Sequence, residues 1–370
     1  MKRLSWITPT CYVDVDLYIL KELDSLYDIH WIVILQPKDG INTQQYIERT
    51  LGTYKNIKIT YIWQKHRLRS LKNLKFIWDF IQLAKSTKPD VIYTSEYAPP
   101  FGIILYKLLL PLNKTIAACH NVTTPQGAQK ERFAKFYTHL WLKTFTNIQT
   151  FSKSQCQILQ QKYKGKNILM SYLALKDYGV PTVTEKKNDN IIRFLVFGNI
   201  VKYKRIDLLL KAANILHERG VKGFEIRIAG NCKEWNEQYA PIIKYPELFD
   251  LQIKRIPNED VANLFADSDY FVMPYQDIAQ SGAITVAFRY NLPVICSDIE
   301  QFKEFIIDGE TGFTFKNKNE FNLADKMEWI IKNHSSIYDT IKYKQQLFVA
   351  KNLSIKTIVN KYILYMRISS

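Results

Sequence analysis

The sequence lacks the features that define several classes of protein. Its start has no charged segment followed by an apolar run, as a signal peptide would have. The longest apolar stretch, residues 101–112, is interrupted by Lys107 and is shorter than the ~20 residues that a membrane span needs. The five cysteines are scattered, and no pair has the spacing of metal ligands. We therefore expect a cytosolic protein with reduced, buried thiols.

Two recognisable modules are also missing. The loop after the first predicted strand, residues 8–14, has no Gly-x-Gly-x-x-Gly, so we expect no dinucleotide cofactor in the first half. No nucleic-acid-binding module is recognisable either, and we expect no nucleic-acid partner.

The composition is that of a globular protein with an uneven charge. The 370 residues are 47% apolar and 23% charged, and this length predicts two domains. Residues 1–180 hold 25 lysines and arginines against 12 acidic residues, whereas residues 181–370 hold 26 against 23. The excess of positive charge in the first half fits an acidic substrate or an anionic membrane surface better than it fits nucleic acid.

Short apolar runs that alternate with helical patterns predict parallel strands in both halves. In the first half the runs are residues 4–7, 29–35, 57–62, 89–94, 115–119 and 148–151. A first helix has Leu17, Leu20, Leu23 and Leu26 on one face, and a helix within 126–144 carries Phe133, Phe136, Tyr137 and Trp141, which we interpret as core. The polar residues 176–190 predict a linker. The predicted domains are therefore 1–175 and 191–333, followed by helices over 334–370.

Residues 194–313 carry the most informative pattern. Runs at 194–197, 224–229 and 270–274 are each followed by a loop and a helix, as in an open α/β sheet. Ligands bind such sheets at the carboxyl ends of the strands.

Two of these strand-to-helix turns suit a diphosphate. One combines Gly198 with the basic residues Lys202, Lys204 and Arg205, and the other is Ser281-Gly282-Ala283 at a predicted helix N-terminus. Free backbone N–H groups and the positive end of a helix dipole favour phosphate there.

Two motifs make a family resemblance specific. Gly198 and Lys204 form Gly-x-x-x-x-x-Lys, and Pro293-Val-Ile is followed by Asp308-Gly-Glu-Thr-Gly-Phe. In this order and spacing they resemble the donor-binding domain of family 4 glycosyltransferases, the glycosyl transferases group 1, over about a third of the chain. The resemblance implies the GT-B fold: two Rossmann-like α/β domains that face each other across a cleft, with a C-terminal helix that crosses back to the first domain.

The sequence departs from the family pattern around the donor. Asn199 stands where arginine usually follows the first glycine, and Arg205 stands where glycine is usual. The positions of two glutamates, which usually meet the donor sugar and the ribose, are occupied by Ile278 and Val286. A branch of bacterial polysaccharide glycosyltransferases is similar in having tyrosine and Ser-Gly where this chain has Tyr275 and Ser281-Gly282.

The resemblance implies which residues hold a nucleotide-diphosphate sugar. Lys204 would stabilise the leaving diphosphate, so that no metal and no other cofactor is required, although a lysine of this kind can also be a solvated loop residue. Glu304 is a candidate for the ribose contact, with a capping or surface role as the alternative. The expected donor-binding residues are Gly198, Asn199, Lys204, Arg205, Arg255, Ile256, Gln280, Ser281, Gly282, Ala283 and Glu304.

The first domain would supply the rest of the site. His120 follows the predicted strand 115–119, where the family commonly has a histidine near the donor sugar, and a structural histidine is the alternative. Asp14-Val-Asp16 spells the Asp-x-Asp that holds a metal in other glycosyltransferases, but acidic residues are common at a helix start. We therefore expect Asp14, Asp16 and Glu96 to contact the acceptor and assign no metal ligand.

Residues 65–85 combine basic residues with an apolar face and a single acid, Asp79. They predict either an ordinary helix packed on the sheet or a basic face resting on anionic lipid, with part of Phe76 or Phe80 exposed. Because similar enzymes often use lipid-linked acceptors, the resemblance favours a basic first domain that meets an anionic membrane surface.

These observations predict a hexosyltransferase-type glycosyltransferase. It would move a sugar from a nucleotide-diphosphate sugar to a saccharide or lipid-linked saccharide in the synthesis of capsule, lipopolysaccharide or exopolysaccharide. The resemblance implies retention of configuration, and a location in the cytoplasm or on the inner face of the cell membrane. The alternative, motivated by the absent glutamates, is a non-catalytic protein of the same fold that binds a nucleotide sugar or a saccharide.

Overall fold

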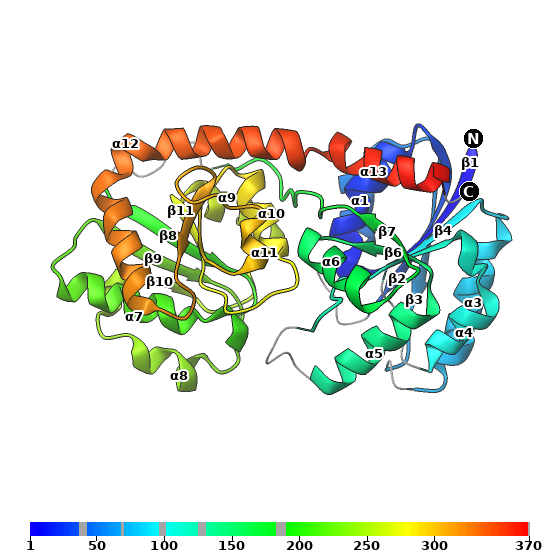
Figure 1. The fold of residues 1–370 in the computed structure, drawn as a ribbon, viewed down its shortest axis with the longest axis horizontal. Helices are drawn as coiled ribbons and strands as arrows, with labels where there is room; N and C mark the ends of the chain where they lie inside the picture. The colour runs from blue at the N-terminus through cyan, green and yellow to red at the C-terminus, as the bar shows by residue number, and fades with distance from the viewer. Residues whose placement is uncertain (37–42, 68–69, 96–100, 125–130, 183–189, 369–370) are drawn as a thin grey trace. The chain divides into compact units, whose positions relative to one another are not determined.

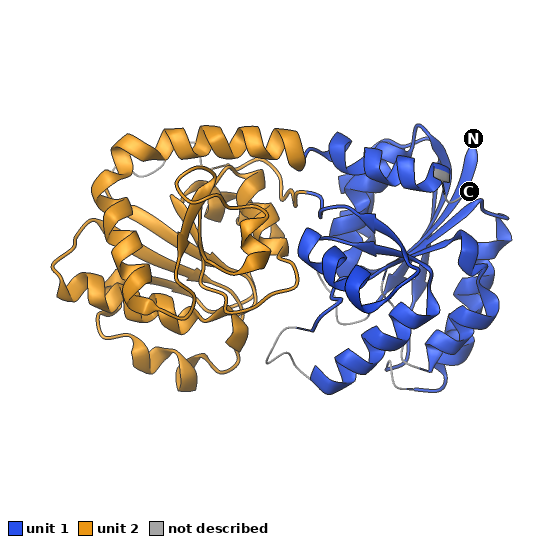
Figure 2. Ribbon diagram, in the orientation of Figure 1, with its two compact units in different colours: residues 1–124, 129–174, 353–370 blue, residues 125–128, 175–352 orange. Residues whose placement is uncertain are grey.

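The computed structural model describes residues 1–36, 43–67, 70–95, 101–124, 131–182 and 190–368. The chain divides into two compact units (Figure 2). The described part of unit 1 runs up to residue 174 and resumes at residue 353, and unit 2 comprises the described residues of 175–352. Each unit is built on a parallel sheet, which confirms the predicted α/β class with two Rossmann-like domains.

Unit 1 contains a seven-stranded sheet with the order β3-β2-β1-β4-β5-β6-β7 (Figure 1). Its strands are β1 (Lys2–Pro9), β2 (Tyr27–Leu35), β3 (Ile57–Trp63), β4 (Val91–Thr94), β5 (Thr115–Ala118), β6 (Asn147–Thr150) and β7 (Asn167–Met170). Its helices are α1 (Val13–Leu23), α2 (Gln44–Leu51), α3 (Asn73–Ser86), α4 (Gly102–Leu109), α5 (Glu131–Thr144), α6 (Lys153–Lys162) and α13 (Ile355–Ile368). The order reverses between β1 and β4, and such a switch point is where open sheets bind ligands.

Two apolar layers cover the two faces of this sheet. Alternate residues of each strand point to opposite faces, so the central strands carry apolar residues on both faces. One layer holds α1 and α13 against residues such as Leu4 and Trp31, and the other holds α3, α4 and α5 against residues such as Ile32 and Ile148. Leu26, predicted on the first helix, lies beyond the end of α1 and is 46% exposed, so that prediction is wrong.

The last helix completes the core of unit 1. Ile358, Val359, Tyr362 and Met366 of α13 are buried in the same cluster as α1. The amide of Gln149 in β6 donates a hydrogen bond to the hydroxyl of Tyr362. The predicted return of a C-terminal helix to the first domain is therefore confirmed.

Unit 2 contains a six-stranded sheet with the order β10-β9-β8-β11-β12-β13. Its strands are β8 (Ile192–Phe197), β9 (Phe224–Ala229), β10 (Phe249–Gln252), β11 (Tyr270–Met273), β12 (Val294–Ser297) and β13 (Gly312–Phe315). Its helices are α7 (Ile206–Glu218), α8 (Trp235–Gln238), α9 (Asn258–Ala266), α10 (Gly282–Arg289), α11 (Glu300–Lys303) and α12 (Glu320–Asn352). The switch point of this sheet lies between β8 and β11.

The described part of the expected linker and the expected domain end at residue 333 both lie within unit 2. The described residues of 175–182 belong to unit 2, where the backbone N–H of Tyr178 donates to the hydroxyl of Tyr290 at 2.9 Å. Residue 333, the expected end of the second domain, falls inside the continuous helix α12. No helix among the described residues is long and apolar enough to cross a membrane.

Two further expectations about burial are wrong in part. Phe133 and Phe136 of α5 are 50% and 55% exposed, whereas Trp141 of the same helix is fully buried. Of the two candidates for exposure on α3, Phe80 is 1% exposed because it faces the sheet, whereas Phe76 is half-buried. Cys11 is exposed, although Cys119 and Cys296 are buried as expected.

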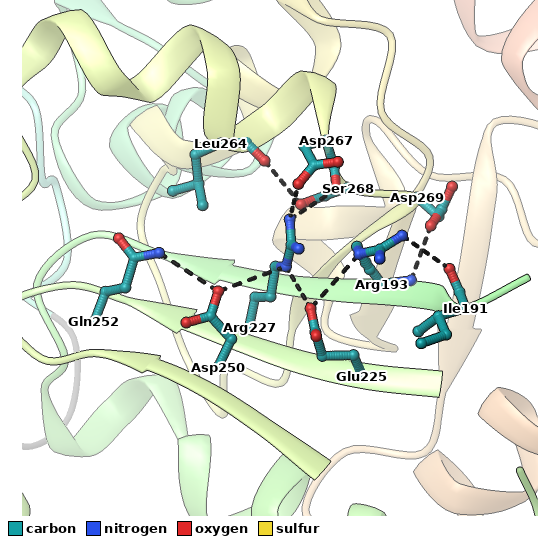
Figure 3. A network of polar contacts seen from close by, with 10 residues as sticks. All are labelled: Ile191, Arg193, Glu225, Arg227, Asp250, Gln252, Leu264, Asp267, Ser268 and Asp269. Atoms are coloured by element: carbon teal, nitrogen blue, oxygen red, sulfur yellow. Dashed lines mark hydrogen bonds and ion pairs between the residues drawn. The ribbon is translucent and has the colours of Figure 1, made fainter. Parts of the chain in front are cut away.

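A buried network of charges joins β8, β9 and the segment before β11 (Figure 3). Arg227, 8% exposed, donates to Glu225 at 2.5 Å and to the carboxylate of Asp267 at 2.6 Å. The backbone N–H of Arg193 donates to Asp269 at 2.8 Å. Asp267 and Asp269, which form an Asp-x-Asp, therefore both have structural partners.

We predict that Arg227→Ala lowers the free energy of unfolding by about 1–3 kcal/mol, because it leaves the partly buried carboxylates of Glu225 and Asp267 without this partner. Arg219→Ala is the matched control, because Arg219 pairs with Asp325 and Glu328 at the surface, and it should cost at most about 1 kcal/mol. Urea denaturation followed by circular dichroism measures both. Equal losses for the two variants would contradict the assigned role of Arg227.

Candidate functional site

The carboxyl ends of β8 and β11 form the candidate donor site in unit 2. These strands are neighbours at the switch point, so the two predicted phosphate turns meet at one edge of the sheet. The backbone N–H of Gln276, after β11, donates to the carbonyl of Tyr203, after β8, at 2.9 Å. The structure thus brings together two segments that are about 70 residues apart in the sequence.

The first turn depends on two glycines. Gly198 has a φ of +96°, which residues with a Cβ rarely adopt. A Cβ on Gly230 would lie 2.1 Å from the carbonyl oxygen of Gly198. A Cβ on Gly198 itself would lie 3.4 Å from the Nζ of Lys204. The two glycines, which follow β8 and β9, therefore let these loops approach closely, and the ammonium of Lys204 lies beside Gly198.

Lys204 is the most unusual residue of this edge. It ends a 3-10 turn, Lys202–Lys204, and only 9% of it is exposed. No hydrogen bond or ion pair joins its Nζ to any residue that the structure describes, and the ring of Tyr275 lies 5.4 Å from it. Burial without an acidic partner lowers the pKa of Lys204 from 10.5 to about 8. A cation held in this way is ready for an anionic ligand.

Arg205 and Asn199, from the same turn, differ from Lys204. Arg205 adopts the left-handed conformation, and its guanidinium donates to both carboxylate oxygens of Asp207, at 2.9 and 2.8 Å. The hydrogen bond to Asp207 raises the pKa of Arg205, and the charge is compensated within the turn. Asn199 is exposed. A donor contact for Arg205 or Asn199 stays a prediction.

The second turn is the start of α10. Ser281 is the N-cap residue, but its side chain accepts no hydrogen bond from the first turn. The side chain of Ser281 therefore leaves the first N–H groups of α10 uncapped, and the helix dipole places partial positive charge at this end of the helix. Ala283 lies within this first turn, and Gln280 directly precedes Ser281.

A second lysine lies at this turn. The Cε and Nζ of Lys176 are 3.2 and 3.4 Å from the point that a Cβ on Gly282 would occupy. Lys176 lies in the linker predicted from the sequence, and nothing in the local sequence links it to a helix about 100 residues later. Gly282 has no side chain, and this leaves space for the end of the Lys176 side chain beside it.

The positions of the missing glutamates are apolar and buried. Ile278 is 7% exposed in the loop after β11, and Val286 is 1% exposed in α10. Neither residue offers a hydrogen bond to a sugar. Any polar contact to the donor sugar must therefore come from other residues.

Three predicted donor contacts lie further along the chain. Arg255 is exposed and Ile256 is half-buried, and both lie between β10 and α9. Glu304 follows α11 and is half-buried. Their roles stay predictions.

His120 lies at the carboxyl edge of the sheet of unit 1. It is 4% exposed and stacks between two rings, Tyr12 with centroids 3.7 Å apart and Phe151 with centroids 4.4 Å apart. The three rings come from segments that follow β1, β5 and β6. The stack fixes the plane of the imidazole, and the predicted role near the donor sugar stays a prediction.

Asp16 bridges the switch point of unit 1. It is 1% exposed, and its Oδ2 accepts hydrogen bonds of 2.7 Å from the hydroxyls of Thr8 and Ser95, which lie at or beyond the ends of β1 and β4. Burial raises the pKa of Asp16 to about 6. Both hydroxyls occupy Oδ2 of a carboxylate that is almost fully buried, and the expected acceptor contact of Asp16 stays a prediction.

The other acidic candidates are Asp14 and Glu96. Asp14 lies in the first turn of α1, as the sequence predicted, and Glu96 lies outside the described residues. In the described part of the chain, no three histidine, cysteine, aspartate or glutamate side chains gather in an arrangement that holds a metal ion.

Comparison with known proteins agrees with this geometry. Residues 182–347 match the sequence model of the family "Glycosyl transferases group 1". No curated protein matches the chain in sequence at a significant level.

Solved structures match the chain from end to end. A glycosyltransferase from Rickettsia africae ESF-5 has a TM-score of 0.76 and 16% identity over 100% of this chain and 98% of its own. Anabaena Alr3699/HepE, in complex with UDP and glucose, has a TM-score of 0.72 and 13% identity over 100% of both chains. Sucrose-phosphate synthase from Thermosynechococcus elongatus has a TM-score of 0.73 and 12% identity over 100% of this chain and 99% of its own. The fold is therefore the GT-B fold of glycosyltransferases.

We predict that Lys204→Met stabilises the protein at pH 7, by up to about 3 kcal/mol, because it removes a buried charge without a partner. The folded state releases the proton of Lys204 near pH 8 and the unfolded state near 10.5, so the wild-type protein regains this stability as pH rises between these values. The gain should therefore shrink by pH 10. Lys202→Met, at an exposed position of the same turn, is the control and should change stability little. Thermal melts at pH 7 and pH 10 measure the effect, and a destabilised Lys204→Met would contradict it.

Proposed function

We propose that this protein is a glycosyltransferase that takes a sugar from a nucleotide-diphosphate sugar and transfers it to a saccharide or lipid-linked saccharide. The observation that carries the proposal is the buried ammonium of Lys204, which has no acidic partner among the described residues and lies beside Gly198 at the switch point of unit 2. The match of residues 182–347 to a glycosyltransferase family supports it.

The arrangement suits the chemistry of the leaving group. When the bond between the anomeric carbon and the diphosphate oxygen breaks, the electron pair stays on the diphosphate, and negative charge grows there. Lys204 would neutralise part of this charge, and the first N–H groups of α10 would donate to the phosphate oxygens. Lys176 beside Gly282 would add a second positive charge. These groups are fixed before the reaction begins, and no metal ion is needed for this role.

The acceptor hydroxyl would form the new bond to the anomeric carbon, and its proton would leave with the products. We propose retention of configuration and an acceptor that belongs to surface polysaccharide synthesis. The tyrosine and Ser-Gly pattern of Tyr275 and Ser281-Gly282 supports this acceptor class. A cytoplasmic location accords with the supply of nucleotide sugars.

His120 would be a catalytic residue supplied by unit 1, as the resemblance implies. The rings of Tyr12 and Phe151 hold the imidazole plane, so a ring nitrogen would be presented in one direction. This pre-organisation would reduce the cost of ordering the side chain when the donor binds.

One observation favours a second function. Ile278 and Val286 are apolar and buried where the resembling family has glutamates. A protein that binds a nucleotide sugar or a saccharide without turnover would keep Lys204 and could lose both carboxylates.

The proposal is tested first by binding. Melting temperatures are measured with UDP, GDP, ADP and their sugars, with and without EDTA, because a ligand of the folded state raises the melting temperature. We expect one base to raise it selectively and independently of EDTA. Lys204→Met should lose this shift and Lys176→Gln should reduce it. The control Lys222→Met, at an exposed position directly before β9 and so at the amino ends of the strands, should keep it. No shift with any diphosphate would contradict the proposal.

Turnover then separates the two functions. Release of the nucleoside diphosphate from the selected donor is measured with membrane and polysaccharide extracts as acceptors. Release by the wild-type protein, and its loss in Lys204→Met, would support the transferase. Binding without release in any extract would favour the binding protein.

A further inference from the structure

Tyr275 is fully enclosed, although it lies in the loop between β11 and α10 rather than in a strand or helix. Only 1% of it is exposed. The hydroxyl of Ser297, at the end of β12, donates a hydrogen bond to its backbone carbonyl. The ring of Phe302 from α11 lies beside its ring, with centroids 5.8 Å apart. These contacts from two neighbouring elements fix the ring of Tyr275 at the carboxyl edge of the sheet of unit 2.

The loop that holds Tyr275 is joined to the turn that holds Lys204. The backbone N–H of Gln276 donates to the carbonyl of Tyr203 at 2.9 Å, and Gln276 directly follows Tyr275 while Tyr203 directly precedes Lys204. The rings of Tyr203 and Tyr275 meet edge to face, with centroids 6.1 Å apart. The side-chain amide of Asn317, after β13, donates to the carbonyl of Gln276 at 3.2 Å. The positions of Tyr275 and Lys204 are therefore fixed relative to each other.

The ammonium of Lys204 lies over the ring of Tyr275. Its Nζ is 5.4 Å from the ring centroid, within the distance of about 6 Å at which the negative face of an aromatic ring attracts a cation. Both side chains are buried, and this attraction is strongest where water is excluded. Burial raises the pKa of Tyr275 well above its usual value, so the hydroxyl stays neutral. The attraction therefore comes from the ring and not from a tyrosinate.

The charged groups nearby do not replace this contact. The charged residues of the adjoining turns are Lys202, Arg205, Asp207, Asp277 and Asp298. Arg205 and Asp207 pair with each other at 2.8 Å, and Asp298 accepts a hydrogen bond from the backbone N–H of Asn317 at 2.8 Å. No carboxylate of the described residues forms an ion pair with Lys204, and burial is the cause that lowers its pKa.

We propose that Tyr275 is a positioning residue for Lys204, whose ammonium its ring holds beside Gly198 in the charged form until an anionic diphosphate binds. In the free protein the ring offsets part of the cost of burying this charge. The diphosphate in this statement rests on the proposed function, whereas the contact between ring and ammonium does not.

The first test needs no ligand. The chain is labelled with ¹³C and ¹⁵N in its lysines, and the signal of the Lys204 ammonium is identified by its absence from Lys204→Met. An NMR titration then gives the pKa of Lys204. We expect Tyr275→Leu to lower this pKa from about 8 to about 7, because the charged form loses the ring. Tyr275→Phe keeps the ring and should leave the pKa unchanged.

A second series keeps the shape of the side chain and changes only its electrostatics. Phenylalanine analogues with one, two and three ring fluorines are introduced at position 275, and each fluorine weakens the negative face of the ring. Relative to Tyr275→Phe, the pKa of Lys204 should fall with each fluorine. This series decides the question even where Tyr275→Leu does not fold.

The matched control is Phe271→Leu, which removes a fully buried ring from β11, the same strand that leads to Tyr275. It should lower the melting temperature as Tyr275→Leu does but leave the pKa of Lys204 where it is. An unchanged or raised pKa in both Tyr275→Leu and the fluorinated series would overturn the proposal. An equal fall of the pKa in Phe271→Leu would also overturn it, because the effect would then come from loosened packing.

Binding provides a test of the role toward the ligand. The probe is UDP, GDP or ADP, whichever raises the melting temperature most. At pH 8, Tyr275→Leu should bind it about fivefold more weakly than the wild type, because less of its Lys204 is protonated. At pH 6 the ammonium is protonated in both proteins, and the difference should shrink to less than about twofold.

The outcomes separate this proposal from the proposed function. The same loss of affinity at pH 8 and pH 6 would show that Tyr275 only supports the local structure, and would overturn the proposal. Failure of the wild-type protein to bind any of the three diphosphates would instead contradict the proposed function. The NMR titration of Lys204 would still decide the role of Tyr275 in that case, because it requires no ligand.

Discussion

The structure of the candidate donor site depends on one unfavourable interaction, the burial of the ammonium of Lys204 without an acidic partner among the described residues. Removing a charge from water is costly, and the lowered pKa of Lys204 reflects that cost. The surrounding turn is built to permit it: Gly198 and Gly230 approach so closely that neither tolerates a side chain easily. A bound diphosphate would offset this cost, because its negative charge would pair with the ammonium of Lys204.

The two units handle buried charge at their switch points in opposite ways. In unit 1, Asp16 is buried between β1 and β4, and the hydroxyls of Thr8 and Ser95 satisfy it. In unit 2, Lys204 is buried between β8 and β11 and lacks any such hydrogen bond in the described structure. Asp16 therefore joins the ends of β1 and β4 through hydrogen bonds within unit 1. The charge of Lys204, in contrast, would be compensated by a bound anionic ligand.

Much of this could be predicted from the sequence, because it rests on local pattern. Apolar runs located most of the strands, although not β7 or β10, and the glycine-to-lysine spacing indicated the turn that holds Lys204. The rest depends on packing between distant segments. The proximity of Lys176 to Gly282 depends on chain geometry across about 100 residues, and the buried charge of Arg227 depends on Asp267 from another element. Phe133 and Phe136 were misplaced because α5 has more aromatic residues than one helix face can bury, and local periodicity does not select which remain outside.

The most direct test of the central claim is proton uptake when the diphosphate binds. Lys204, with a pKa of about 8, is about half deprotonated at pH 8 in the free protein, and a bound diphosphate should restore its proton. Isothermal titration calorimetry of the tightest-binding nucleoside diphosphate at pH 8, in two buffers of different ionisation enthalpy, measures that uptake. The account predicts uptake of roughly half a proton per site at pH 8, rising towards a whole proton at pH 9, where the diphosphate itself stays fully ionised. Binding at pH 8 without any proton uptake would show that the diphosphate does not meet Lys204, and would contradict the account.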